Sequence, residues 1–96
     1  MNQIWLINDS KDKAGDNGEY FFRYLTKVKP KDIDYYFIIG KDCSDYYRLK
    51  VYGNVLDVNS TEYLEYFLRA DKIISSVFES WVSNPFGNDG KYMRFL

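Results

Sequence analysis

Histidine is absent from this chain of 96 residues, and cysteine occurs only once, as Cys43. The lack of histidine excludes Ser-His and Cys-His nucleophile pairs, and it removes the commonest general base and metal ligand. A lone cysteine cannot form an internal disulfide, so Cys43 is expected to be a plain thiol in a reducing compartment. We therefore predict no catalytic residue, no metal site and no bound cofactor in these residues.

A strong charge of either sign and long apolar runs are also missing. The 13 basic and 14 acidic residues give a net charge of −1, which argues against an electrostatic footprint for nucleic acid. The densest cationic stretch, residues 27–31, permits only a weak contact with a membrane surface, because Asp32 and Asp34 follow it. No run reaches the length of a transmembrane helix, and the N-terminus does not look like a signal peptide. We expect a cytoplasmic location.

Aromatic residues, by contrast, are plentiful. They make up 20% of the chain, with ten tyrosines and seven phenylalanines, and hydrophobic residues make up 46%. This is enough apolar material for the core of one small domain, which is also what the length allows. The simplest interpretation is that short helices need bulky side chains to cover a small sheet, and the alternative is a dedicated sugar-stacking or nucleic-acid role.

Apolar runs of strand length alternate with segments that have a helical pattern. The expected strands are residues 4–7, 35–39, 55–58 and 72–77, and the expected helices are residues 19–28, 46–52 and 62–69. Residues 80–90 follow no such pattern and are expected to form a loop. The candidate caps are Asp16 with Glu19 as a capping box, Ser44 or Asp45, Asn59 with Glu62, and Gly53 after the second helix.

Alternation of apolar strands with helices predicts an α/β domain, in which a parallel sheet is covered on both faces in three Rossmann-like layers. With right-handed crossovers, the strand order 3-2-1-4 in chain numbering fits best. The first two helices then cover one face and the third covers the other. The winding reverses between the first and fourth strands, where open α/β sheets bind ligands. Residues 8–18 and the residues from 75 onward are expected to flank that point.

Two polar patterns at this point are candidate substrate contacts. The turn Asp16-Asn17-Gly18 leads into the first helix and directs backbone N–H groups at one spot, which suits an anion or a hydroxyl-rich group as well as simple capping. Ser75 and Ser76 end the fourth strand and are able to hydrogen-bond a ligand or another loop. Neither pattern has the spacing of a dinucleotide site or a P-loop.

Two further patterns leave alternatives open. Asn84 lies in the 80–90 segment, which forms either an ordered loop on the substrate side or a connector anchored by aromatic residues. Asn8 and Asp9 with Asp57 place acids near two strand ends, which resembles the acidic pocket of phosphoacceptor receiver domains. The receiver pattern also requires a second acid after the first strand and a fifth strand, and neither is evident here.

Three stretches together resemble one known family. They are WLI, DKAGDNGE and FRYL in residues 5–25, YFII, KD, SDY and RL in residues 36–49, and ADKIISS with NPF in residues 70–86. These stretches are similar to the CDP-glycerol:poly(glycerophosphate) glycerophosphotransferases, the enzymes of teichoic-acid and capsule synthesis. The resemblance implies a GT-B enzyme that transfers glycerol phosphate, or a related polyol phosphate, from a CDP-linked donor to a polymer at the inner face of the cell membrane.

The resemblance also bears on what this chain contains. The family's catalytic histidines lie downstream of the matched region, so a chain without histidine is expected to be inactive alone and to need the missing C-terminal half. Residues 1–96 are then a single, truncated piece of the N-terminal acceptor-side domain, which agrees with the bulky apolar ending of residues 91–96. Asp16, Asn17 and Gly18 are the positions placed at the interdomain cleft. The alternative function is a stand-alone flavodoxin-like or receiver-like binding module.

Overall fold

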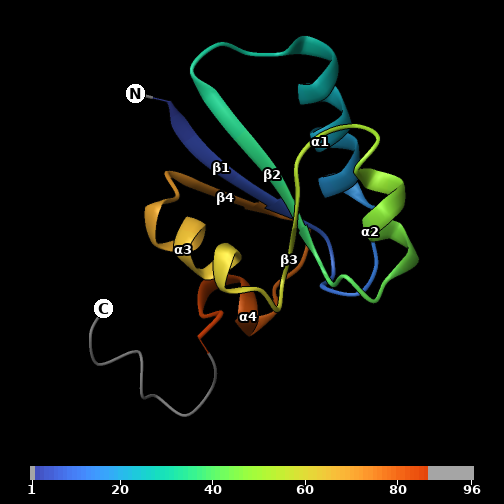
Figure 1. Cartoon of the computed structure of the whole chain (residues 1–96), viewed down its shortest axis with the longest axis vertical. Coiled ribbons are helices and arrows are strands. Elements are labelled where there is room, and N and C mark those ends of the chain that lie inside the picture. The colour runs from blue at the N-terminus through green and yellow to red at the C-terminus, as the bar shows by residue number, and fades with distance from the viewer. Residues whose placement is uncertain (1, 87–96) are drawn as a thin grey trace.

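The computed structural model describes residues 2–86 and shows a three-layer α/β domain, with a four-stranded sheet between two layers of helices (Figure 1). Strands and helices alternate along the chain, as the hydrophobic pattern predicts. In chain order the elements are β1 (Gln3–Asn8), α1 (Asn17–Val28), β2 (Ile33–Ile39), α2 (Ser44–Leu49), β3 (Val55–Asp57), α3 (Thr61–Arg69), β4 (Lys72–Ser75) and α4 (Ser80–Ser83).

The sheet has the strand order β3-β2-β1-β4, and every neighbouring pair is parallel. Trp5 of β1 lies opposite both Tyr35 of β2 and Lys72 of β4, and Phe37 of β2 lies opposite Val55 of β3. The predicted order 3-2-1-4 is therefore confirmed. The winding reverses between β1 and β4, so the carboxyl ends of these two strands define the point where such sheets bind ligands.

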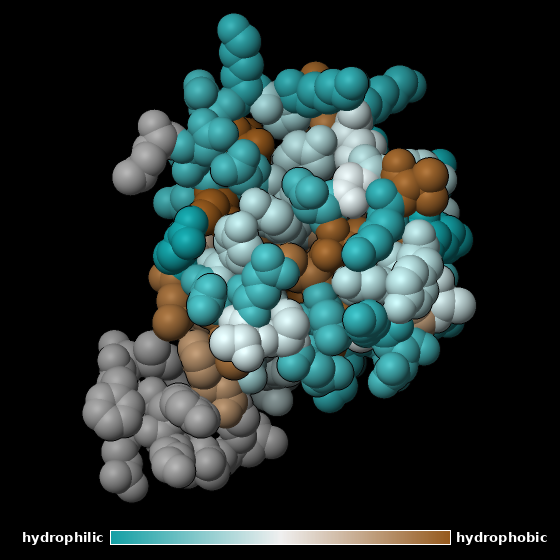
Figure 2. All heavy atoms as spheres, in the orientation of Figure 1, coloured by the Kyte–Doolittle hydropathy of each residue, from teal (hydrophilic) through white to brown (hydrophobic). Residues whose placement is uncertain are grey.

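Each face of the sheet has its own apolar core. On one face, α1 and α2 bury Phe22 and Leu49 against the strands, and on the other face α3 buries Tyr63. Figure 1 shows α1 and α2 on one side of the sheet and α3 on the other, as predicted from the crossovers. On the side of the molecule drawn in Figure 2, hydrophobic residues form separate patches among hydrophilic ones.

The predicted caps of the second and third helices are wrong. Cys43 is the N-cap of α2 and makes no side-chain cap bond, and its thiol donates to the carbonyl of Asp12. The carboxylate of the predicted Asp45 accepts from Ala14 and Arg48 instead. Ser60, one residue beyond the predicted Asn59, caps α3 by accepting a hydrogen bond of 3.1 Å from the N–H of Tyr63. Such one-residue differences are expected, since several polar residues in a row can each satisfy the first free N–H groups.

Two further local predictions are corrected by the structure. Gly53 does not end the second helix, because α2 already ends at Leu49. Gly53 instead packs against the Phe22 ring, which would lie 3.1 Å from a Cβ atom added to this glycine. The segment predicted as a loop from residue 80 begins with the short helix α4, whose Trp81 packs into the α3 core. The rest of that loop from residue 87, and residues 91–96, lie outside the described residues. Within residues 2–86, none of the helices combines the length and hydrophobicity that a membrane crossing needs.

Candidate functional site at the carboxyl end of β1

Three polar side chains are buried in the described part of the chain, and all three lie between the end of β1 and the first turn of α1. They are Asn8, Asp9 and Glu19, with 2%, 2% and 3% of their surface exposed. Buried polar groups cost free energy unless they are hydrogen-bonded, so they mark a region whose partners are closely specified. The concentration of all three at the predicted winding reversal identifies this region as the candidate site.

The carboxylate of Asp9 is bound at the N-terminus of α1. Its Oδ2 atom accepts from the N–H groups of Asp16 at 3.0 Å and Glu19 at 3.1 Å, and its Oδ1 atom accepts from the N–H of Gly18 at 2.8 Å. Oδ1 also accepts from the hydroxyl of Ser76 at 2.6 Å. A negative charge at this end of a helix is favoured by the free N–H groups and by the helix dipole. The protein therefore supplies its own anion at the spot where the sequence suggested a ligand.

Gly18 is required by the closeness of α1 to the end of β1. A Cβ atom on Gly18 would lie 2.5 Å from both the carbonyl oxygen of Asn8 and the Oδ1 atom of Asp9. Both distances are far inside van der Waals contact, and one of the two atoms belongs to the backbone. The glycine thus permits the short hydrogen bond from its N–H to Asp9, which any larger residue would disturb.

The end of β4 joins the same polar cluster. The side-chain N–H of Asn8 donates to the hydroxyl of Ser75 at 2.9 Å, and the backbone N–H of Ser76 donates to the carbonyl of Asn8 at 3.2 Å. The Ser75 hydroxyl also bonds both backbone groups of Val77, which turns the chain and ends β4 two residues earlier than predicted. The two polar turns at the winding reversal are therefore in direct contact, as the topology predicted.

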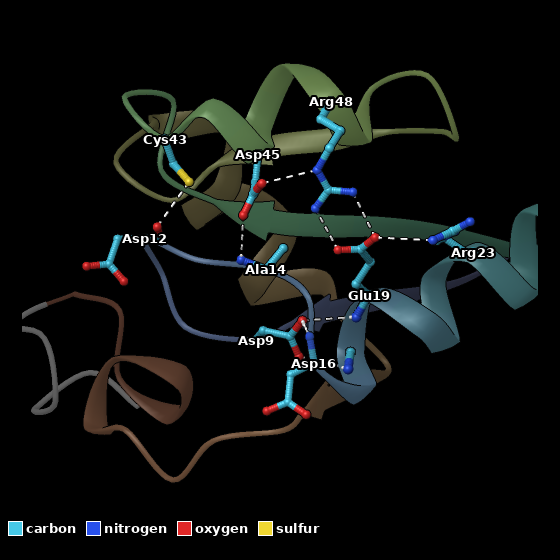
Figure 3. A network of polar contacts seen from close by, with 10 residues as sticks. Asp9, Asp12, Ala14, Asp16, Glu19, Arg23, Cys43, Asp45 and Arg48 are labelled. Atoms are coloured by element: carbon cyan, nitrogen blue, oxygen red, sulfur yellow. Dashed lines mark hydrogen bonds and ion pairs between the residues drawn. The ribbon is translucent and has the colours of Figure 1, made fainter.

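An ion-pair network ties α1 to α2 beside this cluster. Arg48 of α2 binds both carboxylate oxygens of Glu19, at 2.9 and 2.7 Å, and its Nε atom donates to Asp45 at 3.1 Å. Asp45 also accepts from the N–H of Ala14 at 3.0 Å, while Arg23 lies 3.6 Å from Glu19. Figure 3 shows these side chains pointing toward one another between the two helices. Glu19 is thus an ion-pair residue and not part of a capping box, whereas Asp16 is the N-cap of α1 as predicted.

The network shifts the pKa values of its members in the direction that keeps them charged. Hydrogen bonds from Arg48 lower the pKa of Glu19 below its ordinary value of 4.5, against an opposing effect of burial. The N–H of Ala14, followed by Arg48, lowers the pKa of Asp45. The two carboxylates in turn raise the pKa of Arg48. These groups are therefore held ionised at neutral pH, which is suited to positioning and unsuited to proton transfer.

The residues predicted to contact substrate occupy three environments. Asp16 and Asn17 are exposed at the start of α1, where the Asp16 carboxylate accepts the N–H of Asn17 at 2.7 Å. Gly18 is buried against β1, and its N–H is bound to Asp9. The serines of β4, Ser75 and Ser76, are half-buried and hydrogen-bonded to Asn8 and Asp9. Asn84 follows α4, in a segment that packs against α3 on the other face of the sheet.

A shallow hollow of about 260 Å³ opens beside this cluster, and its lining includes Asp9, Lys13 and Asp16. The acids at the other strand ends do not join it, since the Asp57 carboxylate accepts the N–H groups of Lys41 and Asn59, both at 3.1 Å. Among residues 2–86 no group of three His, Cys, Asp or Glu side chains is arranged to hold a metal ion. The site can therefore orient a polar ligand through its exposed turn, while its buried acids are already bound.

These features define a doubly wound parallel α/β domain whose only strongly polar interior lies at the winding reversal, within residues 2–86. The chain belongs to the CDP-Glycerol:Poly(glycerophosphate) glycerophosphotransferase family, whose model matches residues 1–89. It is 42% identical over 93 residues to the "Minor teichoic acid biosynthesis protein GgaB" of Bacillus subtilis (strain 168). That match covers 97% of this chain and 10% of the relative, so the chain spans about a tenth of the length of the curated relative it matches. No solved structure matches the chain significantly.

Sequence reasoning missed the two residues that organise the site most strongly. The sequence pattern places Asp9 only in an acidic set with Asp57. An acid directly after a strand and ahead of a glycine-led helix is nevertheless a usable signal for an internal anion at the helix start. Arg48 is 29 residues from its partner Glu19, and no local pattern connects them. Only the packing of α2 against α1 brings the pair together.

Proposed function

We propose that this chain is part of the acceptor-side, N-terminal half of a GT-B transferase that adds glycerol phosphate, or a related polyol phosphate, to a teichoic-acid-type or capsule polymer. The observation that carries the proposal is the family match over residues 1–89, and the similarity to a teichoic acid biosynthesis protein supports it. The donor would be a CDP-linked polyol, and the enzyme would work in the cytoplasm at the inner face of the membrane.

The proposed reaction is a phosphoryl-group transfer. The terminal hydroxyl oxygen of the polymer attacks the donor's β-phosphorus, a new phosphodiester bond forms, and the bond from that phosphorus to the oxygen of the leaving CMP breaks. The hydroxyl proton must pass to a base. In the candidate site Asp9 already accepts four hydrogen bonds, and Glu19 is held ionised by Arg48. We therefore assign the base to residues outside this chain, which makes the chain inactive by itself.

The role left for this site is to position the acceptor. The side chains of Asp16 and Asn17 are exposed at the start of α1, beside the hollow at the carboxyl edge of the sheet. They can exchange hydrogen bonds with the hydroxyls of a polyol. The buried Gly18 and the half-buried Ser75 and Ser76 act in this proposal by holding the turn in place, since their bonds to Asp9 and Asn8 fix the position of Asn17.

The experiment is the replacement Asn17→Ala in the full-length protein, with transfer from CDP-glycerol to a polymer acceptor as the measurement. We expect turnover to fall about tenfold, which corresponds to one lost hydrogen bond of about 1.4 kcal/mol in the transition state. Stability should be unchanged, because Asn17 is exposed.

The matched control is Asn54→Ala, an exposed asparagine directly before β3 and therefore at the opposite edge of the sheet. It should leave turnover unchanged. Equal turnover in the Asn17 variant and the control would remove Asn17 from the acceptor site. Mg²⁺-dependent labelling of Asp57 by a phosphodonor would instead favour the receiver-like alternative.

A further inference from the structure

The outward side of α1 carries a second hollow, separate from the cluster around Asp9. Its volume is about 460 Å³, and it lies between α1 and the segment that follows α2. Volumes of this order are typical of sites for small molecules and chain segments. Its lining residues are Tyr20, Arg23, Tyr24, Thr26, Lys27 and Tyr52.

The lining combines exposed aromatic rings with cations. Tyr20 and Tyr24 are 61% and 58% exposed, and Tyr52 is 38% exposed. The guanidinium of Arg23 lies 4.6 Å from the centre of the Tyr52 ring, and Lys27 stands one helical turn further along α1. Among residues 2–86, no acidic side chain lines the hollow. The Glu19 carboxylate lies 3.6 Å from Arg23, and both of its oxygens are already bound by Arg48.

We propose that this hollow binds the phosphodiester backbone of the polyol phosphate chain, at a distance from the reacting end. The inference rests on the proposed function for the chemistry of its ligand. Arg23 and Lys27 are four residues apart on one face of α1, which separates them by about 6 Å along the axis. That spacing is comparable with the separation of successive phosphates joined by a three-carbon polyol. The tyrosine rings offer apolar faces to the carbon chain and hydroxyls to its oxygens.

The position of the hollow is consistent with a bound polymer whose end reaches the acceptor site. Tyr20 stands in the first turn of α1, two residues after Gly18, so the hollow begins about one turn from the exposed Asp16-Asn17 turn. A polymer held against the outward side of α1 is therefore led toward the carboxyl edge of the sheet. In this arrangement the hollow retains the growing chain between successive additions.

The composition of the hollow favours a polymer chain over a lipid surface. Anionic membranes are usually recognised by clusters of about four to eight Lys or Arg residues, whereas this lining holds two. It is also concave, and a flat bilayer cannot enter a hollow lined by Thr26 and Tyr52 on facing segments. A flexible phosphodiester chain can follow such a surface.

The experiment measures binding of a synthetic six-unit glycerol phosphate oligomer to the 96-residue chain by calorimetry. Lys27→Gln should weaken binding about threefold to fivefold, as expected for one exposed charge contact. The matched control is Lys41→Gln, which removes the same charge from an exposed residue in the loop that follows β2. The control should bind as the unchanged chain does. A second variant, Tyr24→Ala, should weaken binding without any change of charge.

Several results would overturn the proposal. One is equal weakening by Lys27→Gln and Lys41→Gln, which would indicate unspecific charge attraction. Another is complete competition by inorganic phosphate at equal phosphate concentration, which would indicate a simple anion site. A third is absence of oligomer binding together with binding to vesicles containing phosphatidylglycerol, which would indicate a membrane surface.

Failure of the proposed function gives a different result. If the full-length protein transfers glycerol phosphate but the chain does not bind the oligomer, the hollow proposal is wrong and the transferase assignment stands. If the full-length protein transfers no CDP-linked polyol, the function is wrong. Lys27-dependent oligomer binding would then still support an anionic-chain site on α1.

Discussion

The N-terminal end of α1 and its outward side are chemically opposite surfaces of one helix. At the N-terminal end the backbone N–H groups of Gly18 and Glu19 donate to the buried carboxylate of Asp9. On the outward side Tyr24 is more than half exposed, and Lys27 is exposed beside it. The backbone N–H groups at the start of α1 are thus used by the fold, and the exposed side chains of Asp16 and Asn17 are what the turn still offers to a ligand.

The reason for the difference is tethering. Asp9 follows β1 directly, so its carboxylate is held close to the start of α1 at an effective concentration that a free anion cannot match. Binding an external phosphate there would require displacement of an acceptor that already has four hydrogen bonds. In the described part of the chain, no such internal carboxylate lines the hollow on the outward side of α1. The comparison therefore predicts large stability effects for the buried groups at the N-terminal end, and binding effects for the exposed side chains on the outward side.

The largest expected effect is that of Gly18→Ala at the N-terminal end. The added Cβ atom would meet Asn8 and Asp9 at 2.5 Å, so the helix must move away from the strand and its short hydrogen bond to Asp9 must lengthen. We expect the free energy of unfolding, measured with urea, to fall by about 3 kcal/mol.

Gly15→Ala is the matched control for the Gly18 substitution. Gly15 has a positive φ of 99° but has no atom within 4 Å of its Cβ position. Its cost should come from backbone strain alone, about 1 kcal/mol. If Gly15→Ala proves as costly as Gly18→Ala, close packing does not explain the need for glycine at the start of α1.

Arg48→Met is expected to cost about 2 kcal/mol at pH 7, because it leaves the buried carboxylate of Glu19 without its main partner. The figure lies below the usual range for buried pairs because the Arg48 side chain is 44% exposed. Arg23→Met is the control, since Arg23 contacts the same carboxylate only at 3.6 Å, and it should cost less than 1 kcal/mol.

The cost of Arg48→Met should depend on pH with a definite sign. Because Arg48 lowers the folded-state pKa of Glu19 below 4.5, the stabilisation is fully present above that value and is lost as the pH falls through the folded pKa. The unfolding free energies of the unchanged chain and the variant should therefore converge below pH 4. A difference that stays constant from pH 7 to pH 3 would contradict the ion-pair explanation.

The fold could be predicted from the sequence because its signals are local and repeated. Apolar runs ending at residues such as Ile7 and Ile39, and helix stops such as Pro30, fix the alternation of elements. Right-handed crossovers then leave few strand orders, and the one chosen is confirmed. The same reasoning correctly predicted that Ser76 lies near the end of β1.

The candidate site could be predicted only in part, because its partners are decided by packing. A turn such as Asp16-Asn17-Gly18 looks the same whether its N–H groups face a ligand or an internal carboxylate, so the role of Asp9 is visible only in three dimensions. Glu19 lies three residues after Asp16, the spacing of a capping box, yet its side chain accepts hydrogen bonds from Arg48 across the α1–α2 contact. Side-chain partners far apart in the chain leave no periodic signal.

The smallest of these effects is expected for Ser76→Ala, which tests whether the two turns at the winding reversal support each other. The Ser76 hydroxyl donates to Asp9 at 2.6 Å, a hydrogen bond to a charged acceptor, and Asp9 keeps its three backbone donors when it is lost. We therefore expect a loss of about 1 to 1.5 kcal/mol in urea unfolding. Ser83→Ala, at an exposed serine whose hydroxyl bond is 3.4 Å long, should change stability by less than 0.5 kcal/mol.

The result for Ser76→Ala also shows whether the Ser76–Asp9 hydrogen bond connects the end of β4 to the start of α1. If the serine contributes, β4 is fastened to α1 through Asp9, and a ligand that disturbs either turn must disturb both. If Ser76→Ala and Ser83→Ala are equally silent, the backbone N–H groups alone hold Asp9 at the start of α1. The end of β4 would then be tied to the polar cluster only through Asn8, which binds Ser75 and the N–H of Ser76.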